Sequence, residues 1–234
     1  MKSMMKIGII VGVACTMMSG CTSSDEPVLK KNDVIVFLGD SITAQGVQPD
    51  GYVTLVSNRI AQTYPDLAIK VIGAGIGGHK VPDCQARLDR DVLQKNPTLV
   101  VIYIGINDVW HWNRDNGTPI DQFETGLRDM IAKINSAGAR VILCTPTVIG
   151  EKTDGKNEYD KMLDEYSGIS RKVTAETGSQ MLDLREAFLS YLKEHNTDNV
   201  EEGILTTDTV HLNKNGNSVL AGLMLEALNV PIEQ

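Results

Sequence analysis

Three polar residues of this chain have the types and the spacing of an activated nucleophile. Ser41 follows an apolar run in the motif "GDSIT", while Asp208 and His211 stand three residues apart in "TTDTVHLNKNG". A serine hydroxyl attacks only weakly until a base removes its proton, and an imidazole can do this and later protonate a leaving alcohol. An aspartate about one helical turn before the imidazole can fix its tautomer. We therefore expect a Ser41, His211 and Asp208 triad.

Three other histidines compete for the role of base. His79 follows a glycine-rich loop, His195 sits at a polar helix end, and His111 lies between two tryptophans. His111 is the strongest competitor, but its aromatic neighbours fit a pocket wall. We therefore expect His211 to act.

Short apolar runs alternate with longer amphipathic stretches from residue 33 onward. The runs are "DVIVFLGD", "LAIKVIG", "TLVVIYIG", "ARVILCTP" and "SQMLDL". Their nearly continuous hydrophobicity fits strands that are buried on both faces. The clearest helical patterns cover 81–95, 120–137, 158–177, 184–195 and 214–228. This alternation predicts an α/β fold of three layers, with a flavodoxin-like, five-stranded parallel sheet between two layers of helices.

The residues that follow the strands carry a family resemblance. The segments "GDSIT", "GAGIGG", "GIND" and "TTDTVHLNKNG" resemble, in order, the four sequence blocks of the SGNH (GDSL-type) hydrolases. Each block alone is weak, because Gly-Asp-Ser is common in turns and Asn-Asp in helix caps. Together they span nearly all of the chain from residue 33. The resemblance implies an esterase that works through an acyl-enzyme, with no metal and no cofactor.

The resemblance also implies an oxyanion hole. It assigns the hole to the backbone N–H groups of Ser41 and Gly75 and to the side-chain amide of Asn107. Such donors stabilise the charge that develops on a carbonyl oxygen under attack. The family often has asparagine where this chain has Gly73, which puts in doubt how rigidly the loop is held. Asp40 is expected to orient the serine turn through local hydrogen bonds or simply to form the turn.

Glycines 73, 75 and 78 also fit the Gly-x-Gly-x-x-Gly fingerprint of dinucleotide-binding folds. In those folds the fingerprint follows the first strand, and an acidic residue closes the next strand about 20 residues later. Here the glycines follow the second strand, and the next one ends in "YIGIN". We therefore do not expect a nucleotide site.

Two segments could shape the substrate site. In 109–121, Trp110, His111 and Trp112 are candidate substrate contacts: the indoles could stack on a sugar, wall an acyl pocket or merely cover the sheet edge. The segment 147–160 is polar and contains glycine, so we expect a mobile rim.

The expected substrate is a small acyl ester, with an acetylated carbohydrate preferred. This preference rests on the resemblance and on the expected cell-surface location rather than on any residue that is typical of sugar recognition. A lysophospholipase or thioesterase of the same family is an alternative, and so is a surface binding module without catalysis. The net charge of -8, the pI near 5.0 and the lack of a basic run argue against nucleic acid as a partner.

The N-terminus has the pattern of an exported lipoprotein. Residues 1–20 combine lysines, an apolar run and small residues, which is typical of a signal peptide. The run from Ile7 to Gly20 is shorter than the about 20 residues of a membrane span. Cys21 ends a lipobox-like "MSGC" and is the expected lipidation site. Residues 21–32 would then be a polar tether to a membrane and 33–234 the hydrolase domain.

The cysteine count leaves one candidate disulfide. Cys15 would leave with the signal peptide and Cys21 would carry lipid, so only Cys84 and Cys144 remain. Cys144 lies within an apolar run, where a small buried side chain is the ordinary role, so we expect both thiols to be free.

Overall fold

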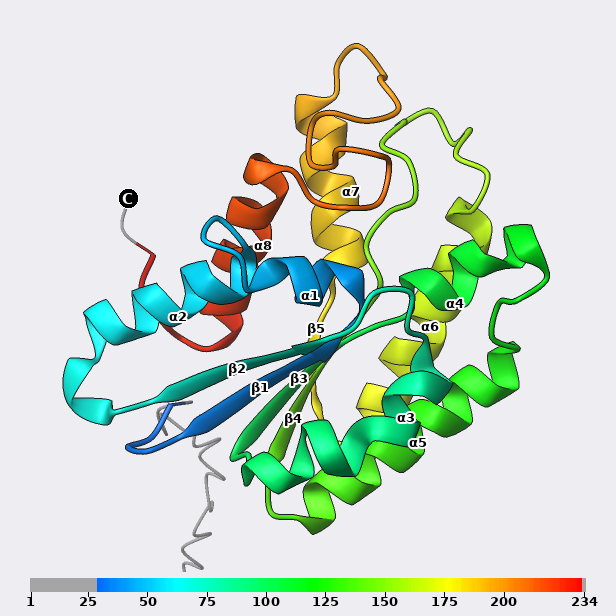
Figure 1. Cartoon of the computed structure of the whole chain (residues 1–234). Coiled ribbons are helices and arrows are strands. Elements are labelled where there is room, and N and C mark those ends of the chain that lie inside the picture. Colours follow the sequence, from blue (N-terminus) through cyan, green and yellow to red (C-terminus); the bar gives the residue numbers. More distant parts are fainter. Residues whose placement is uncertain (1–28, 233–234) are drawn as a thin grey trace, which may run out of the picture.

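A five-stranded parallel sheet forms the centre of the molecule (Figure 1). The computed structural model describes residues 29–232. The strands are β1 (Val34–Gly39), β2 (Lys70–Gly75), β3 (Leu99–Tyr103), β4 (Arg140–Cys144) and β5 (Gln180–Leu182). Their spatial order is β2-β1-β3-β4-β5, and every neighbouring pair is parallel. The predicted flavodoxin-like sheet is confirmed, because each apolar run forms one strand.

Helices cover both faces of the sheet. They are α1 (Ser41–Gly46), α2 (Tyr52–Thr63), α3 (Val81–Asp91), α4 (Ile106–Trp110), α5 (Ile120–Ser136), α6 (Asp160–Thr177), α7 (Leu184–His195) and α8 (Lys214–Ala227). Short 3-10 helices cover Pro65–Leu67, Leu93–Lys95 and His111–Arg114. In Figure 1, α1, α2, α7 and α8 lie on one face, and α3, α5 and α6 lie on the other. This is the expected three-layer arrangement.

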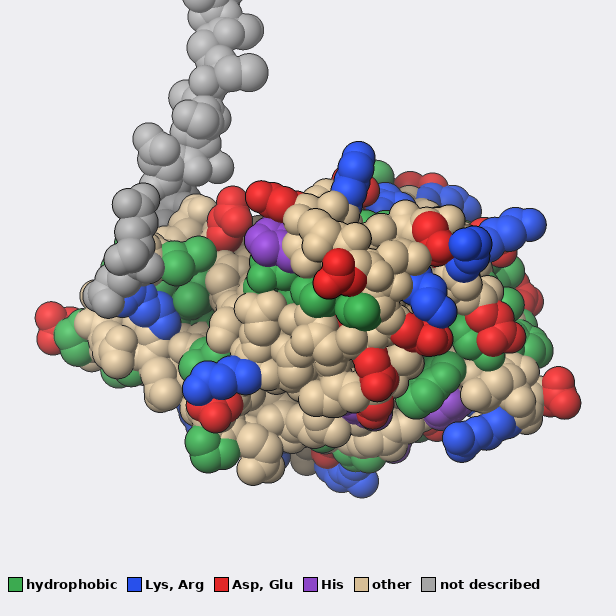
Figure 2. Space-filling model, turned by 90° about the horizontal axis from the view of Figure 1, so that it is seen from above, with side chains coloured by type: hydrophobic (Ala, Val, Ile, Leu, Met, Phe, Trp, Pro, Cys, Tyr) green, Lys and Arg blue, Asp and Glu red, His purple; other side chains and the backbone are tan. Residues whose placement is uncertain are grey.

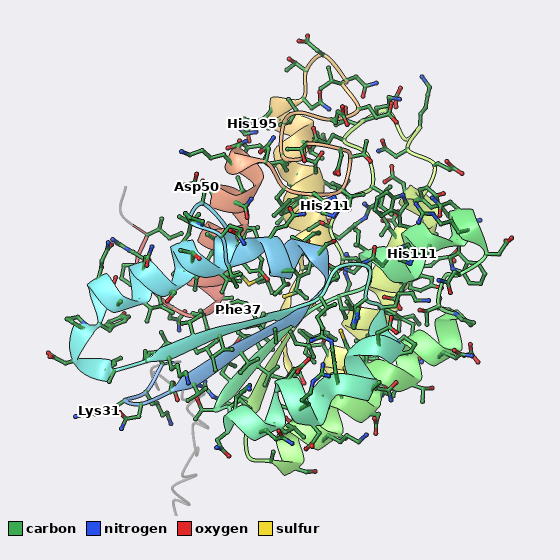
Figure 3. All side chains as sticks on the ribbon, viewed as in Figure 1. Lys31, Phe37, Asp50, His111, His195 and His211 are labelled. Carbon is green, nitrogen blue, oxygen red and sulfur yellow. The ribbon has the colours of Figure 1, made fainter. Side chains whose placement is uncertain are left out.

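The strand order places the first candidate blocks side by side. Gly39 at the end of β1 pairs with Gly75 of β2 on one side and with Tyr103 of β3 on the other. The chain leaves β1 toward β2 and then crosses to β3, so the sheet order reverses next to β1. Parallel α/β sheets bind ligands at such a reversal, outside the carboxyl ends of the strands. Phe37 lies in the buried part of β1, below this edge (Figure 3).

The longest of the three helices that the sequence pattern did not single out, α1, α2 and α4, is α2. Its segment "YVTLVSNRIAQT" is rich in β-branched residues, which have weak helix propensity, and Gly51 at its start provides no side-chain cap. Tertiary packing stabilises it instead, because Tyr52, Val53, Val56 and Ile60 are buried. The helix predicted over 81–95 ends at Asp91 and is followed by the 3-10 turn Leu93–Lys95.

Cys84 and Cys144 are both buried and free, as predicted. The signal peptide over 1–20, the lipidation site Cys21 and most of the tether over 21–32 lie outside the described residues. Among residues 29–232, none of the helices has the length and apolarity needed to cross a bilayer.

Candidate active site

Ser41 stands at the first position of α1, directly after the central strand β1. Asp40 caps this helix, because its Oδ1 accepts the N–H of Ile42 at 2.9 Å. This is the local hydrogen bond expected for Asp40. Gly39 permits the tight turn, since a Cβ there would lie 2.1 Å from Thr43 Oγ1 and 2.5 Å from the Tyr103 carbonyl oxygen. The serine is therefore fixed by the backbone at the carboxyl edge of the sheet.

The imidazole of His211 connects Ser41 to Asp208. Nε2 of His211 lies 2.9 Å from Ser41 Oγ, and Nδ1 lies 2.7 Å from Asp208 Oδ2. If Nδ1–H donates to Asp208, Nε2 is left as an acceptor for the serine hydroxyl. Asp208 Oδ1 accepts the backbone N–H of His211 at 2.7 Å. The three residues therefore form one continuous chain of hydrogen bonds.

Asp208 and His211 meet in a turn, and the expected helical turn between them is absent. Thr209 has a left-handed backbone with φ of 73°, and Thr206 forms an isolated antiparallel bridge with Leu212. Thr207 N–H also donates to the carbonyl of His211 at 2.8 Å. Asp208 and His211 are close together as expected, but they lie in a loop that the Asp208 side chain stabilises by accepting the His211 N–H.

The other three histidines have different partners. Nδ1 of His79 accepts from Arg87 Nε at 3.1 Å. His195 stacks on Tyr191 at the distal end of α7 (Figure 3). His111 lies near Gly78, where a Cβ would come within 3.9 Å of its ring. Partial burial and the charge of a nearby cation, Arg87 for His79 and Lys80 for His111, lower the pKa of both rings. Of the four, His211 is the one whose ring reaches Ser41.

The pKa values of the carboxyl groups in the site are shifted in opposite directions. Burial raises the pKa of Asp40 to about 7, although the hydrogen bond from Ile42 opposes this shift. Burial likewise raises the pKa of Asp108 to about 6. Asp108 accepts the Val81 N–H and so ties "GIND" to the start of α3. At Asp208, partial desolvation favours the acid, but hydrogen bonds from His211 outweigh it and lower the pKa.

Gly75 lies against the serine turn. A Cβ at this position would be 2.1 Å from the Ala44 nitrogen and 2.7 Å from the Asp40 carbonyl oxygen, so only glycine fits. The next residue, Ile76, donates its N–H to the Gly39 carbonyl of β1 at 3.2 Å. Because successive N–H groups of a strand point to opposite sides, the Gly75 N–H points away from β1.

Asn107 is buried in the first turn of α4. Its side-chain amide donates to the His79 carbonyl at 3.0 Å, which holds α4 against the loop after β2. An amide carries two N–H donors, so one remains for another acceptor. The loop with Gly75 and the "GIND" block are thus hydrogen-bonded together, although Gly73 replaces the family's usual asparagine.

A buried guanidinium that the sequence analysis did not single out supports this arrangement. Arg87 of α3 donates to the Ala74 carbonyl at 2.8 Å and to the Gly39 carbonyl at 2.7 Å. Each carbonyl shares a rigid peptide plane with the following N–H, so Arg87 also orients the N–H of Gly75. The signal for it was an arginine on the buried face of α3, beside Cys84 and Leu88.

A second unforeseen residue, Glu151, anchors the loop that carries His211. Its buried carboxylate accepts the backbone N–H groups of Ile204 and Leu205, each at 2.8 Å, and the hydroxyl of Thr206 at 2.7 Å. Gly150 N–H donates to the Thr209 carbonyl at 2.9 Å. The mobile rim expected over 147–160 is therefore not what the structure shows for its first part, because residues 147–151 are buried and hold the histidine loop.

The three candidate substrate contacts separate in the structure. Trp110 packs edge-to-face on His211, with ring centroids 6.3 Å apart. His111 faces the loop after β2, as described above. Trp112 lies elsewhere: its Nε1 lies 3.5 Å from the Tyr166 hydroxyl, and its ring fills the space beside Gly117. Trp112 is 37% exposed and packs beside Gly117, whereas Trp110 is the tryptophan in contact with the His211 ring.

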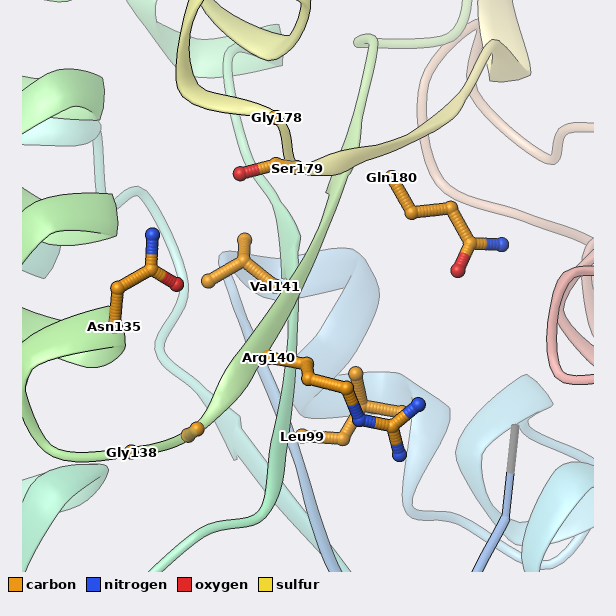
Figure 4. Close-up of a pocket in the computed structure, with 9 residues that line it drawn as sticks. Leu99, Asn135, Gly138, Arg140, Val141, Gly178, Ser179 and Gln180 are labelled. Atoms are coloured by element: carbon orange, nitrogen blue, oxygen red, sulfur yellow. The ribbon is translucent and has the colours of Figure 1, made fainter. Parts of the chain in front are cut away.

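Two cavities have very different positions. One of about 350 Å³ lies at the amino ends of β3, β4 and β5, between Leu99, Arg140 and Gln180 (Figure 4). This is the edge of the sheet opposite Ser41. Another of about 140 Å³ lies beside Trp110 and Thr209 and so adjoins the histidine loop. Within residues 29–232, no three His, Cys, Asp or Glu side chains are grouped so that they could hold a metal ion.

Comparison with known proteins supplies the family. Residues 37–219 match the GDSL-like Lipase/Acylhydrolase family. An acetylxylan esterase of Geobacillus stearothermophilus is 32% identical over 213 residues, which cover 83% of this chain and 93% of that protein. The crystal structure of an acetyl xylan esterase, AlAXEase, is 42% identical with a TM-score of 0.81, over 83% of this chain and 98% of that one.

Structures of Axe2, an acetylxylan esterase of Geobacillus stearothermophilus, bear on the site. Three of them are of catalytic mutants, in which a histidine, a serine or an aspartate is replaced by alanine. They are 27% or 28% identical to this chain with TM-scores of 0.77, over 87% or 88% of this chain and 97% or 99% of theirs. The chain described here belongs to the GDSL-like lipase/acylhydrolase (SGNH) family and is a carboxylic ester hydrolase.

Proposed function

We propose that this protein is a serine acetylesterase that removes acetyl groups from carbohydrate, with Ser41 as nucleophile, His211 as base and Asp208 as its orienting acid. The observation that carries the proposal is the hydrogen-bond chain from Ser41 through His211 to Asp208. The acetylxylan esterases among its relatives support both the acetyl group and the carbohydrate. The Axe2 mutants support the roles, because they change the same three residue types.

In the first half of the reaction, Ser41 Oγ attacks the acetyl carbonyl while His211 Nε2 takes the hydroxyl proton. The imidazolium that forms is stabilised by Asp208, whose lowered pKa keeps it ionised. His211 then gives the proton to the sugar oxygen as the ester C–O bond breaks. The sugar leaves with a free hydroxyl, and the acetyl group stays on Ser41.

The negative oxygen of the tetrahedral intermediate needs fixed donors. We assign them to the N–H groups of Ser41 and Gly75 and to the Asn107 amide. The lack of room for a Cβ at Gly75 and the peptide orientation held by Arg87 support this assignment. Donors held in this way need no rearrangement when the charge appears.

In the second half, a water molecule attacks the acetyl-Ser41 carbonyl while His211 Nε2 accepts its proton. The oxyanion donors stabilise the second tetrahedral intermediate as they did the first. His211 returns the proton to Ser41 Oγ as the C–O bond of the acyl-enzyme breaks. Acetate is released and the enzyme is restored.

A short acyl group fits the molecule better than a long one. In Figure 2, hydrophobic side chains form only small separate patches among charged ones of both signs on the face seen from above. A lysophospholipase needs a wide apolar cleft, and a strong preference for long-chain aryl esters over acetyl esters would contradict this proposal.

The test is the rate of acetate release from acetylated xylo-oligosaccharides by the full-length protein in mild detergent. Ser41→Ala should reduce turnover by several orders of magnitude without a change in fold or thermal stability. Ser190→Ala, which changes an exposed serine on α7, is the matched control and should retain full activity. Equal activity of wild type and Ser41→Ala would refute the assignment.

We also propose that the protein is exported and held at a membrane by lipid on Cys21, with residues 21–32 as the tether. The support is the sequence of the first 32 residues alone. Labelled palmitate fed to expressing cells should enter the wild-type protein and should not enter Cys21→Ser. Cys15→Ser, within the segment that cleavage removes, is the control and should keep the label. Label in Cys21→Ser would reject the anchor.

A further inference from the structure

The cavity of about 140 Å³ beside the histidine loop is lined by residues from several separate segments of the chain. Trp110 comes from the end of α4, Glu158 and Tyr159 come from the segment before α6, and Thr209 comes from the turn between Asp208 and His211. Cavities for drug-sized ligands have about 300–1,000 Å³, so this one has room for a single ring.

The cavity adjoins the group that delivers a proton to the leaving alcohol. Trp110, which lines it, packs on the His211 imidazole with an interplanar angle of 70°. Thr209, on another wall, lies two residues before His211, and its carbonyl is held by Gly150 N–H at 2.9 Å. Since His211 Nε2 protonates the departing oxygen, the alcohol part of the ester must pass next to this ring. The cavity therefore lies where the alcohol part of the substrate can bind.

The lining residues offer hydrogen-bonding groups that the protein itself does not use. The Trp110 indole N–H, the Tyr159 hydroxyl and the Glu158 carboxylate make no hydrogen bond or ion pair with another part of the described chain. Partial burial and the nearby charge of Glu158 raise the pKa of Tyr159, which keeps the phenol as a donor. An indole and a phenol beside a carboxylate match a ligand that has apolar C–H faces and several hydroxyls.

We propose that this cavity is a subsite for one sugar ring on the alcohol side of the ester, with Trp110 against the face of the ring and Tyr159 and Glu158 hydrogen-bonded to its hydroxyls. The inference rests on the proposed carbohydrate substrate and assigns its recognition to residues. It gives Trp110 a binding role and explains why the segment before α6 is held beside the histidine loop.

The test compares two substrates with the same acetyl group. An acetylated xylo-oligosaccharide presents sugar hydroxyls, whereas p-nitrophenyl acetate has none. Tyr159→Phe and Glu158→Gln should each lower the ratio of kcat/KM for the sugar ester to that for the aryl ester by about tenfold, mainly through KM. Glu202→Gln, at an exposed carboxylate outside the cavity, is the control and should leave the ratio unchanged.

A binding measurement separates this inference from the proposed function. The chain has two tryptophans, so Trp112→Phe leaves Trp110 as the sole indole. Titration of this variant with xylotriose should change the Trp110 emission, and adding Glu158→Gln should weaken the binding about tenfold. If wild type deacetylates the sugar but the substrate ratio and the emission do not respond, the subsite is refuted. If wild type hydrolyses only the aryl ester, the proposed substrate is wrong, and absence of an emission change then refutes the subsite as well.

Discussion

The turn that carries Ser41 is built into the sheet, whereas the loop that carries Asp208 and His211 contains only one isolated β-bridge. Around Ser41, backbone packs on backbone so closely that Gly39 and Gly75 have no room for a Cβ. Around His211, a buried carboxylate from a distant segment, Glu151, holds the loop by accepting its N–H groups. One half of the site is thus fixed by steric fit and the other by hydrogen bonds.

The two regions also differ in their charges. The carboxyl group below Ser41, Asp40, is buried and its pKa is raised to about 7. The carboxyl group beside His211, Asp208, is 52% exposed and its pKa is lowered. Burial decides the first, and hydrogen bonds decide the second. The contributions of these two carboxyl groups to stability should therefore depend on pH with opposite signs.

The largest effect is expected from Gly75→Ala, which tests the half of the site that close backbone packing holds in place. The added Cβ would sit 2.1 Å from the Ala44 nitrogen, so either β2 or α1 must move. We expect kcat/KM to fall about 1,000-fold, because both the oxyanion donor and Ser41 are displaced. Gly168→Ala is the matched control: it lies in α6 with open space around it and should stabilise the fold by about 0.5–1 kcal/mol without changing activity. Wild-type rates for Gly75→Ala would contradict the steric account.

Glu151→Gln tests the half of the site that hydrogen bonds hold in place. The amide keeps the shape of the carboxylate but brings an N–H group toward backbone N–H donors. We expect kcat to fall about 100-fold through displacement of His211, and the free energy of unfolding to fall by about 2–4 kcal/mol. Glu165→Gln, at an exposed carboxylate on α6, should change neither. Urea denaturation and steady-state kinetics would measure both effects, and an unchanged kcat would remove Glu151 from the account.

Arg87→Lys tests the connection between strand ends and oxyanion donors. Lysine keeps the charge but cannot bridge the Gly39 and Ala74 carbonyls as a planar guanidinium does. We expect kcat to fall about tenfold with little change in KM, because the substrate pocket is intact while the Gly75 N–H is less well oriented. A loss confined to KM would argue against this role.

Asp40→Asn has the smallest expected effect on activity and shows itself in the pH dependence of stability. Asp40 holds its proton up to about pH 7 when folded but only to about 3.8 when unfolded, so wild-type stability falls as the pH rises between these values. The amide still accepts the Ile42 N–H and has no proton to lose. The variant should therefore gain stability relative to wild type from pH 4 to 7, by a few kcal/mol. Parallel curves from thermal unfolding at each pH would refute the raised pKa.

Asp208 should contribute a pH dependence of stability with the opposite sign to that of Asp40. Its folded pKa lies below the ordinary 3.8, so its stabilising effect is present above that value and is lost as the pH falls through the folded pKa. Asp208→Asn should therefore reduce the acid dependence of stability below about pH 4, as measured by thermal unfolding, and an unchanged acid dependence would contradict the lowered pKa of Asp208.

The steric half of the site was largely predictable from the sequence. The segments "GDSIT" and "GAGIGG" follow apolar runs, and parallel strands bring such positions to one edge of the sheet. The family resemblance then implied the role of Gly75. The hydrogen-bonded half was predictable only as far as Asp208 and His211, which are neighbours in the chain. Glu151 is about 50 residues from its partners and stands in a polar segment, so no local pattern marks it as a buried carboxylate.

At two further places the structure differs from the sequence prediction, again because contacts distant in the chain or the backbone conformation decide the outcome. Helix α2 was not singled out because tertiary burial of Tyr52 and Val56, rather than local propensity, stabilises it. The spacing of Asp208 and His211 suggested a helical turn, but the left-handed Thr209 and the capping by Asp208 produce the same proximity in a loop. Spacing thus identified the neighbours and left their backbone conformation open.

The most direct test of the central claim is to trap the acyl-enzyme. Wild-type protein would be mixed with p-nitrophenyl acetate, quenched in acid within the first turnover, digested and analysed by mass spectrometry. We expect one acetyl group on the peptide that contains Ser41 and none in Ser41→Ala. Acetylation at another residue, or turnover by Ser41→Ala without a trapped acetyl group, would contradict it.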